Sequence, residues 1–289
     1  MCANIVSKNF KLDWLEFSWT ANTFGKVGGI LEAGLSLWEN FKRVFPEFMP
    51  LIEECFVAEY NIQGYDNVLC LSDEVKFCYS STEMNMGVHV VIPAHGLYRL
   101  GAAFNLESVD DFFLSREMFC SLLERGVRFT RIDLCYDDFN KRITPFEWDN
   151  MAKSGRVECK ARSRSYIASC FKKGDTVYFG RRSGGRMLRI YDKSYESKGV
   201  IDSIRYEFEF KRDYAIAISE SIRDGVVIEF RNLMEMFLKV YDELKHLPED
   251  VSATQLMRDR KVAGLLDAWK DLLNDMNNYS QNADFTKFN

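Results

Sequence analysis

Short stretches in which apolar and polar residues alternate recur along the chain, and this period of two is typical of half-buried β-strands. Residues 11–19 read KLDWLEFSW, with Leu15, Phe17 and Trp19 on one face and polar residues between them. The same pattern, with β-branched and aromatic residues, predicts further strands at 60–72, 75–80, 88–92, 127–139, 176–180, 187–191 and 204–211. The runs between 60 and 92 are short and closely spaced, so we expect them to form a meander.

Other stretches carry apolar residues three or four positions apart, which indicates amphipathic helices. Helices are predicted at 29–45, 108–125 and 144–153, the second opening on a Ser-x-x-Asp cap pattern and the third on Thr-Pro. After Asp213 the chain becomes mainly helical. One amphipathic helix near the C-terminal end is predicted from the spacing of Val262, Leu265, Leu266, Trp269, Leu272, Leu273 and Met276.

These elements predict an α+β fold, in which helices pack on an antiparallel β-sheet and a helical part follows. We place the sheet domain at residues 1–213 and a helical C-terminal region at 214–289. With 289 residues, 47% of them hydrophobic, the chain can bury a sizeable core. No apolar run reaches transmembrane length and no signal peptide is recognised, so we expect no membrane association. The eight cysteines form no CxxC pair, so a zinc ribbon or redox motif is not indicated. We expect the protein in a reducing cytoplasm.

Charge is distributed unevenly along the chain. The formal net charge is −5, yet between Lys153 and Lys193 twelve basic residues face only three acidic ones, Glu158, Asp175 and Asp192. A concentrated basic segment in an acidic protein indicates a local site for a polyanion, and nucleic acid is the polyanion that we favour. The alternative is a solvated surface with scattered charges.

Carboxylates gather on two of the predicted strands. In RIDLCYDD (131–138), alternation puts Arg131, Asp133 and Asp137 on one face, and in RYEFEFK (205–211) it does the same for Glu207 and Glu209. Carboxylates on neighbouring strands make an oxygen site for Mg²⁺ or Mn²⁺. With three histidines in the chain, a histidine-held zinc site is improbable. Two alternatives stay open: Asp137 begins a solvated loop, and the glutamates belong to a salt-bridged surface.

A basic turn precedes the residue that we consider the best nucleophile. Residues 180–186 read GRRSGGR, and such a turn suits phosphate oxygens, although it is not a Walker loop. Tyr191 follows between Arg189 and Lys193. A phenol is a poor nucleophile at neutral pH because its pKa is about 10, but nearby cations favour the phenolate. A half-buried structural tyrosine is the alternative for this position.

Taken together, the motifs resemble those of the Rep_trans family of replication initiation proteins, the initiators of staphylococcal-type rolling-circle plasmids with related relaxases. The residues that carry the resemblance are FTRIDLxxD (129–137), YFGxR (178–182), RIYxK (189–193) and RxExExKRD (205–213), in this order. Asp13 in the first strand also fits a position of the family. The resemblance spans roughly residues 10–215.

The resemblance implies a metal-dependent DNA-nicking enzyme that starts rolling-circle replication. Tyr191 would become joined to the 5′-phosphate of the cut strand and free a 3′-OH primer. Asp133, Glu207, Glu209 and Asp13 would hold Mg²⁺ or Mn²⁺. The DNA would be held by the basic residues Arg131, Arg181, Arg182, Arg186, Arg189, Lys193 and Lys211. Residues 214–289 would bind the origin or support dimerisation.

The partners implied are origin DNA, as a duplex and as an extruded single strand, a host helicase and a second copy of the chain. Two other functions remain open at this stage. One is a conjugative relaxase with the same chemistry, and the other is a DNA-binding regulator that has lost catalysis.

Overall fold

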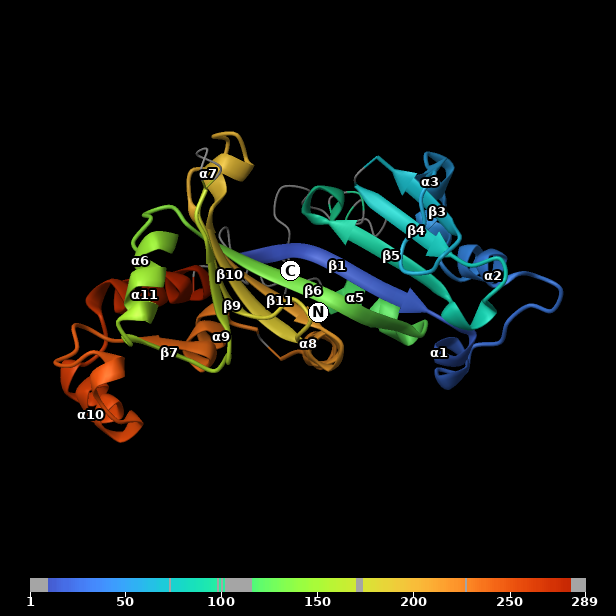
Figure 1. Cartoon of the computed structure of the whole chain (residues 1–289). Helices are drawn as coiled ribbons and strands as arrows, with labels where there is room; N and C mark the ends of the chain where they lie inside the picture. Colours follow the sequence, from blue (N-terminus) through green and yellow to red (C-terminus); the bar gives the residue numbers. More distant parts are fainter. Residues whose placement is uncertain are drawn as a thin grey trace. The chain divides into compact units, whose positions relative to one another are not determined.

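The computed structural model describes residues 10–72, 74–97, 99, 101, 116–169, 174–226 and 228–281. The chain forms two compact units, each assembled from segments that are distant in the sequence (Figure 1). The first unit consists mainly of Lys11–Asp133 and Phe210–Val227, and the second mainly of Leu134–Glu209 and Ile228–Asn289. Two long strands, β6 (Val127–Asp138) and β11 (Ile204–Lys211), contribute residues to both units. The predicted division at residue 213 stays a prediction.

The first unit is a meander with helices against it. Its strands follow the order β2-β3-β4-β5-β1-β6, and the pairs from β2 to β1 are antiparallel. The strands other than β6 are β1 (Phe10–Trp19), β2 (Phe56–Val57), β3 (Asn67–Leu71), β4 (Val75–Tyr79) and β5 (Val88–Pro93). The helices are α1 (Ala21–Lys26), α2 (Leu37–Val44), α3 (Met49–Glu53), α5 (Arg116–Glu124) and α8 (Asp213–Arg223), with short 3₁₀ turns at Pro46–Phe48, Met84–Met86 and Ala94–Gly96.

Aromatic side chains fill the core of the first unit. The Trp19 ring packs edge-on against Phe41 and Phe45 of the α2 segment, with ring centroids 5.9 Å apart in both pairs. Phe17 meets Phe129 at 6.0 Å, and all these rings are buried. Burial of rings of this size is the main source of stability for such a unit.

From β6 onward the strands of the ten-stranded sheet follow the order β6-β11-β10-β9-β8 and belong mainly to the second unit, which also holds a separate small sheet of β7 and β12. The strands not yet bounded are β7 (Val157–Cys159), β8 (Arg164–Ile167), β9 (Thr176–Gly180), β10 (Arg186–Asp192) and β12 (Leu238–Val240). The helices are α6 (Pro145–Lys153), α7 (Lys193–Glu196), α9 (Phe230–Phe237), α10 (Ala253–Ala263) and α11 (Asp267–Gln281), with a 3₁₀ turn at Pro248–Asp250.

Helices cover one face of the second unit's strands. Trp148 of α6 meets Phe179 of β9 at 5.9 Å, Tyr206 of β11 at 6.2 Å and Trp269 of α11 at 5.8 Å. Phe208, two residues after Tyr206, packs on rings of α9. Because side chains alternate along a strand, the intervening residues of β11 project from the opposite face. That second face carries the polar site described below.

The α+β fold and its antiparallel strands are confirmed, but the predicted helix at 29–45 is wrong in its first half. The helix begins at Leu37, where the Ser36 hydroxyl accepts a hydrogen bond from the Glu39 amide at 3.1 Å. The preceding residues form a loop held by the buried Asn40 side chain, and Ile30 is 83% exposed. Of the helix predicted at 108–125, residues 108–115 lie outside the described residues.

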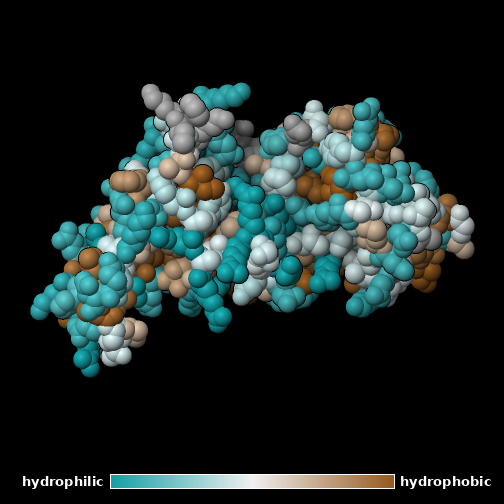
Figure 2. All heavy atoms as spheres, viewed as in Figure 1, coloured by the Kyte–Doolittle hydropathy of each residue, from teal (hydrophilic) through white to brown (hydrophobic). Residues whose placement is uncertain are grey.

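The single C-terminal helix that was predicted is two helices. Gly264 ends α10 with a φ of +75°, a conformation that glycine adopts without strain, and α11 starts again at Asp267. Val262 is therefore 88% exposed instead of buried, as is Met257 at 69%. Figure 2 shows hydrophobic residues at the lower left, where Figure 1 places α10. Across the described residues, no helix is both long and apolar enough to span a bilayer.

Candidate active site

Tyr191 projects from the face of the second unit's strands opposite the one on which α6, α9 and α11 pack. On β10, Leu188 and Ile190 are fully buried, and Arg189 and Tyr191 alternate with them. On β11, Glu207 alternates in the same way with Tyr206 and Phe208. The Tyr191 hydroxyl donates a hydrogen bond to Glu207 Oε2 at 3.1 Å, and both side chains are buried. The structure thus brings together the predicted nucleophile and one of the predicted carboxylates.

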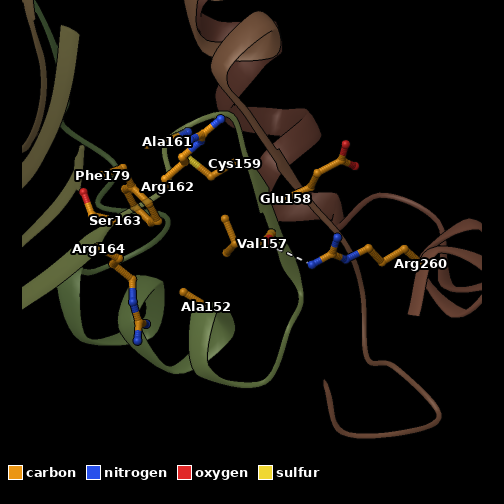
Figure 3. Close-up of a pocket in the computed structure, with 10 residues that line it drawn as sticks. All are labelled: Ala152, Val157, Glu158, Cys159, Ala161, Arg162, Ser163, Arg164, Phe179 and Arg260. Carbon is orange, nitrogen blue, oxygen red and sulfur yellow. Dashed lines mark hydrogen bonds between the residues drawn. The ribbon is translucent and has the colours of Figure 1, made fainter. Parts of the chain in front are cut away.

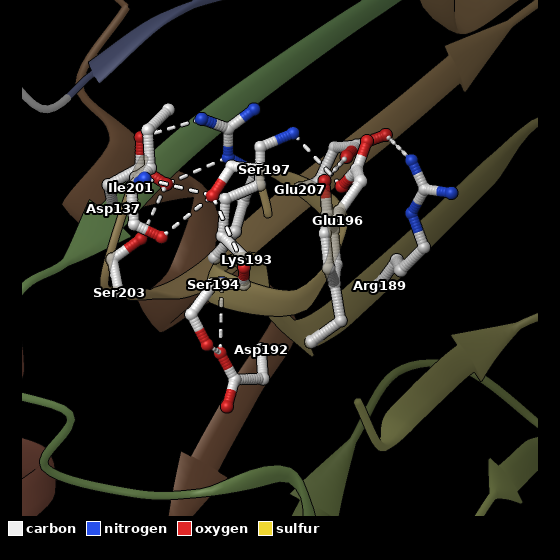
Figure 4. A network of polar contacts seen from close by, with 12 residues as sticks. Asp137, Arg189, Asp192, Lys193, Ser194, Glu196, Ser197, Ile201, Ser203 and Glu207 are labelled. Carbon is white, nitrogen blue, oxygen red and sulfur yellow. Dashed lines mark hydrogen bonds and ion pairs between the residues drawn. The ribbon is translucent and has the colours of Figure 1, made fainter. Parts of the chain in front are cut away.

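Two cations flank the Tyr191 ring. The guanidinium of Arg189 lies 5.0 Å from the ring centroid and pairs with Glu207 Oε1 (Figure 4). Lys193 Nζ lies 5.7 Å from the same centroid. Asp192 ends the strand and caps α7, since its carboxylate accepts a hydrogen bond from the Ser194 amide at 2.9 Å. This turn directs the lysine back to the tyrosine.

A second carboxylate, Glu196, lies close to Tyr191, and sequence reasoning missed it. Glu196 lies on α7 and pairs with Lys193 Nζ at 2.9 Å. Burial raises the pKa of Glu196, but the hydrogen bond and charge of Lys193, a hydrogen bond from Tyr191 and the charge of Arg189 outweigh burial and lower it. The three-residue spacing from Lys193 to Glu196 was the available signal, because residues at this spacing share one side of a helix.

Asp137 has a structural partner. Its carboxylate accepts two hydrogen bonds from Arg205, at Oδ1 and Oδ2, both at 2.7 Å. A third comes from the Ser203 hydroxyl at 3.2 Å (Figure 4). Arg205 and Asp137 are both buried. The alternative in which Asp137 begins a solvated loop is therefore wrong. A bidentate arginine compensates the buried charge of this aspartate.

Asp133 belongs to the first unit, where it is buried. Arg131 Nε donates to Asp133 Oδ1 at 2.9 Å, and the Arg131 guanidinium lies 4.3 Å from the Trp14 ring centroid. Glu16 of β1 joins this cluster, with 3.6 Å from Oε1 to Arg131 Nη1 and 3.6 Å from Oε2 to His89 Nε2. Burial raises the pKa of Glu16, yet the neighbouring His89 and the charge of Arg131 lower it overall.

The other predicted site residues occupy varied positions. Asp13 is buried on β1, where it is in phase with Leu15 and Phe17 and out of phase with Glu16. Glu209 is also buried, at 8% exposure, two residues beyond Glu207. Lys211 is the last residue of β11.

The predicted phosphate-binding arginines divide between a turn and the two faces of the sheet. Arg181 and Arg182 are exposed in the β9–β10 turn. Arg186 is in phase with Leu188 and lies over the Phe237 ring of α9 at 4.8 Å, so it belongs to the helix-covered face. Only Arg189 of β10 shares the face of Tyr191.

The described side chains do not fit a preformed metal centre. Within the described ranges, no three His, Cys, Asp or Glu side chains gather closely enough to hold a metal ion. Glu207 and Asp133 each pair with an arginine instead. We therefore derive no chemical step through a cation.

Chemically, the arrangement defines a class of protein: an α+β protein with a buried tyrosine hydroxyl held between carboxylates and cations on the sheet face opposite the helices. Residues 127–286 match the family described as Replication initiation factor, Rep_trans. This match covers more than half of the chain, so the protein belongs to the replication initiation factor family, as its motifs had suggested.

One solved structure of similar fold is a rolling circle replication initiator protein from Geobacillus stearothermophilus. The two chains share 20% sequence identity with a TM-score of 0.69, and the alignment covers 93% of this chain and 96% of that chain. At this identity the likeness shows the fold alone. Among curated proteins, none matches the chain significantly.

Proposed function

We propose that the protein initiates rolling-circle replication by cutting and rejoining one strand of origin DNA. Tyr191 Oη attacks the scissile phosphorus, the bond from phosphorus to the 3′-oxygen breaks, and a bond from the tyrosine to the 5′-phosphate forms. The departing 3′-oxygen takes a proton from solvent and becomes the 3′-OH primer. One phosphoester replaces another, so rejoining requires no ATP.

The observation that carries this proposal is the position of the Tyr191 hydroxyl. It lies 3.1 Å from Glu207 Oε2, a distance over which a phenol can transfer its proton to a carboxylate. Arg189 and Lys193 flank the ring and would stabilise the negative charge that develops on the phosphate oxygens. A purely structural tyrosine would not require two carboxylates and two cations around it.

A divalent cation, Mg²⁺ or Mn²⁺, stays part of the proposal. The carboxylate oxygens of Asp133, Glu207, Glu209 and Asp13 are ligands of the type that such an ion prefers. Because Glu207 pairs with Arg189, binding an ion there would require the carboxylate to exchange partners.

The DNA must be locally single-stranded at the nick. A scissile phosphate within a duplex cannot bend into a buried site such as that of Tyr191, whereas an extruded hairpin loop can. A duplex contact, a homodimer and a host helicase complete the proposal. They are supported by the resemblance of the motifs to those of the family.

The test is covalent capture. The purified protein is incubated with Mg²⁺ and a random single-stranded oligonucleotide library labelled at the 3′ end, and adducts are isolated under denaturing conditions. Since the tyrosine retains the fragment with the 5′-phosphate, the label should migrate with the protein. Sequencing of the captured DNA then gives the nick sequence.

Tyr191→Phe removes the attacking oxygen and should abolish the adduct. Tyr195→Phe is the matched control, because Tyr195 lies four residues away and is 44% exposed. It should form as much adduct as the wild type. If Tyr191→Phe still forms an adduct, the proposed nucleophile is wrong.

A further inference from the structure

A cleft of about 330 Å³ lies in the second unit, between β7, the segment leading into β8, and α10 (Figure 3). Three arginines line it, Arg162, Arg164 and Arg260, together with Ser163 and Phe179. We propose that this cleft binds backbone phosphates of duplex DNA that flanks the nick. The inference rests on the proposed function for its ligand class, and it places a second DNA contact on this protein.

Arg260 is held in place without a carboxylate. Its Nε and one terminal nitrogen donate to the Gly155 carbonyl at 2.9 and 2.6 Å, and the same terminal nitrogen donates to the Val157 carbonyl at 3.1 Å (Figure 3). Its guanidinium lies 5.7 Å from the Tyr241 ring centroid. Carbonyls orient a guanidinium but do not cancel its charge. Among the described residues no carboxylate forms an ion pair with Arg260, so its charge is directed at the cleft.

Glu158 is the acidic side chain of the cleft lining, and it has another partner. Its carboxylate accepts a hydrogen bond from the Tyr241 hydroxyl at 2.6 Å. Glu158 is exposed, so water screens its interaction with the arginines. One solvated carboxylate against three arginines leaves the cleft electropositive.

Arg164 and Lys153 share a single carboxylate, that of Asp149. Arg164 Nη1 lies 2.9 Å from Asp149 Oδ1, and Lys153 Nζ lies 2.5 Å from Asp149 Oδ2. Two positive charges on a single carboxylate leave an excess of one. A phosphodiester in the cleft would supply the missing negative charge, and arginine forks fit phosphate oxygens well.

Arg162 contributes charge without a structural role. It is exposed, and within the described residues it forms neither an ion pair nor a hydrogen bond. An arginine of this kind at the rim of a cleft is available to a ligand from solvent. Arg162 is also a suitable residue to mutate, because its replacement removes no polar contact among the described residues.

The cleft opens on the face opposite Tyr191. Phe179 lines it and packs on Trp148, whereas its neighbour Tyr178 pairs across the sheet with Arg189, which is on the nucleophile's face. The cleft therefore contacts different nucleotides from those at the tyrosine. Phe179 is 2% exposed, so the cleft presents no ring on which unpaired bases could stack. Both observations favour duplex phosphates over single-stranded bases.

The experiment measures affinity for a duplex of about 30 base pairs and arbitrary sequence, by fluorescence anisotropy over a range of salt concentrations. Loss of one phosphate contact lowers the slope of log K against log salt by about one. Arg162→Ala should weaken duplex binding about 3- to 10-fold with this change in slope, and Arg162→Glu should weaken it more. Arg128→Ala, at an exposed arginine of β6 in the first unit, is the matched control and should bind as the wild type does.

Two outcomes would overturn the inference. One is wild-type duplex affinity and slope for Arg162→Glu. The other is an equal loss of single-strand and duplex affinity, which would make the cleft a general polyanion site. Adduct formation by Arg162→Glu on a single-stranded oligonucleotide should be unchanged. If the wild type forms no adduct but Arg162→Glu still loses duplex affinity, the nicking proposal fails and the cleft inference stands.

Discussion

Replacement of Arg205 by methionine should strongly destabilise the second unit. Arg205 and Asp137 are each 2% exposed at the side chain and are joined by two hydrogen bonds of 2.7 Å. Arg205→Met leaves the Asp137 carboxylate buried without this guanidinium, and the Ser203 hydroxyl, 3.2 Å away, is a neutral donor that cannot replace the positive charge. Breaking a buried pair on one side costs about 3–5 kcal/mol. This corresponds to a fall in Tm of roughly 6–15 °C for a chain of this size.

Urea denaturation monitored by circular dichroism measures the loss in the free energy of unfolding. A second variant tests whether the unpaired buried charge causes this loss. Asp137→Leu combined with Arg205→Met removes both charges of the pair and should recover most of the lost stability, because neither is left buried alone. Asp202→Ala is the matched control from the same unit. Asp202 pairs with Lys141 but is 73% exposed, and an exposed pair contributes about 0–1 kcal/mol. If Arg205→Met costs no more than Asp202→Ala, the pair does not stabilise the fold as we argue.

Two further predictions concern the site around Tyr191. The pKa of Glu196 is lowered in the folded protein, so its stabilising effect is present above its ordinary value of about 4.5 and is lost as pH falls through the lowered value. The urea midpoints of wild type and Glu196→Gln should therefore differ at pH 7 and converge as the pH falls below the lowered pKa of Glu196, and equal midpoints at pH 7 would contradict this reasoning. If adduct formation depends on a divalent cation, a chelator should abolish it and added Mg²⁺ or Mn²⁺ should restore it. Glu209→Gln should then need a higher cation concentration for half-maximal adduct, and full activity in the chelator would remove the cation from the proposal.

The alternation of side chains could be read directly from the sequence at the site. RYEFEFK predicts which residues of β11 face the helices, and Tyr206 and Phe208 do pack on them, whereas Glu207 faces Tyr191. This worked because a strand with one buried face has a strict period of two. The spacing between Tyr191 and Glu207 could be anticipated only through the family resemblance, since strand order is not encoded locally.

Other features depend on contacts that a local pattern does not contain. The pairing of β7 with β12 joins Val157 to Val240 across about eighty residues, and each strand has only three residues. The loop before α2 forms because Asn40 binds its backbone, a tertiary effect that overrides helical spacing. Gly264 was a readable stop signal, but the apolar residues on both sides of it suggested one continuous helix.

The alternation of side chains along β10 ties the position of Tyr191 to the length of the β9–β10 turn. Leu188 and Ile190 are buried on one side of this strand, and Arg189 and Tyr191 project from the other. A slip of the strand by a single residue would move a guanidinium and a phenol into the apolar layer and turn two aliphatic side chains toward Glu207. Insertions or deletions in this hairpin are therefore tolerated only if they change the length of the turn and leave the register of β10 unchanged. The same alternation that buries Leu188 and Ile190 therefore fixes the side to which Tyr191 projects.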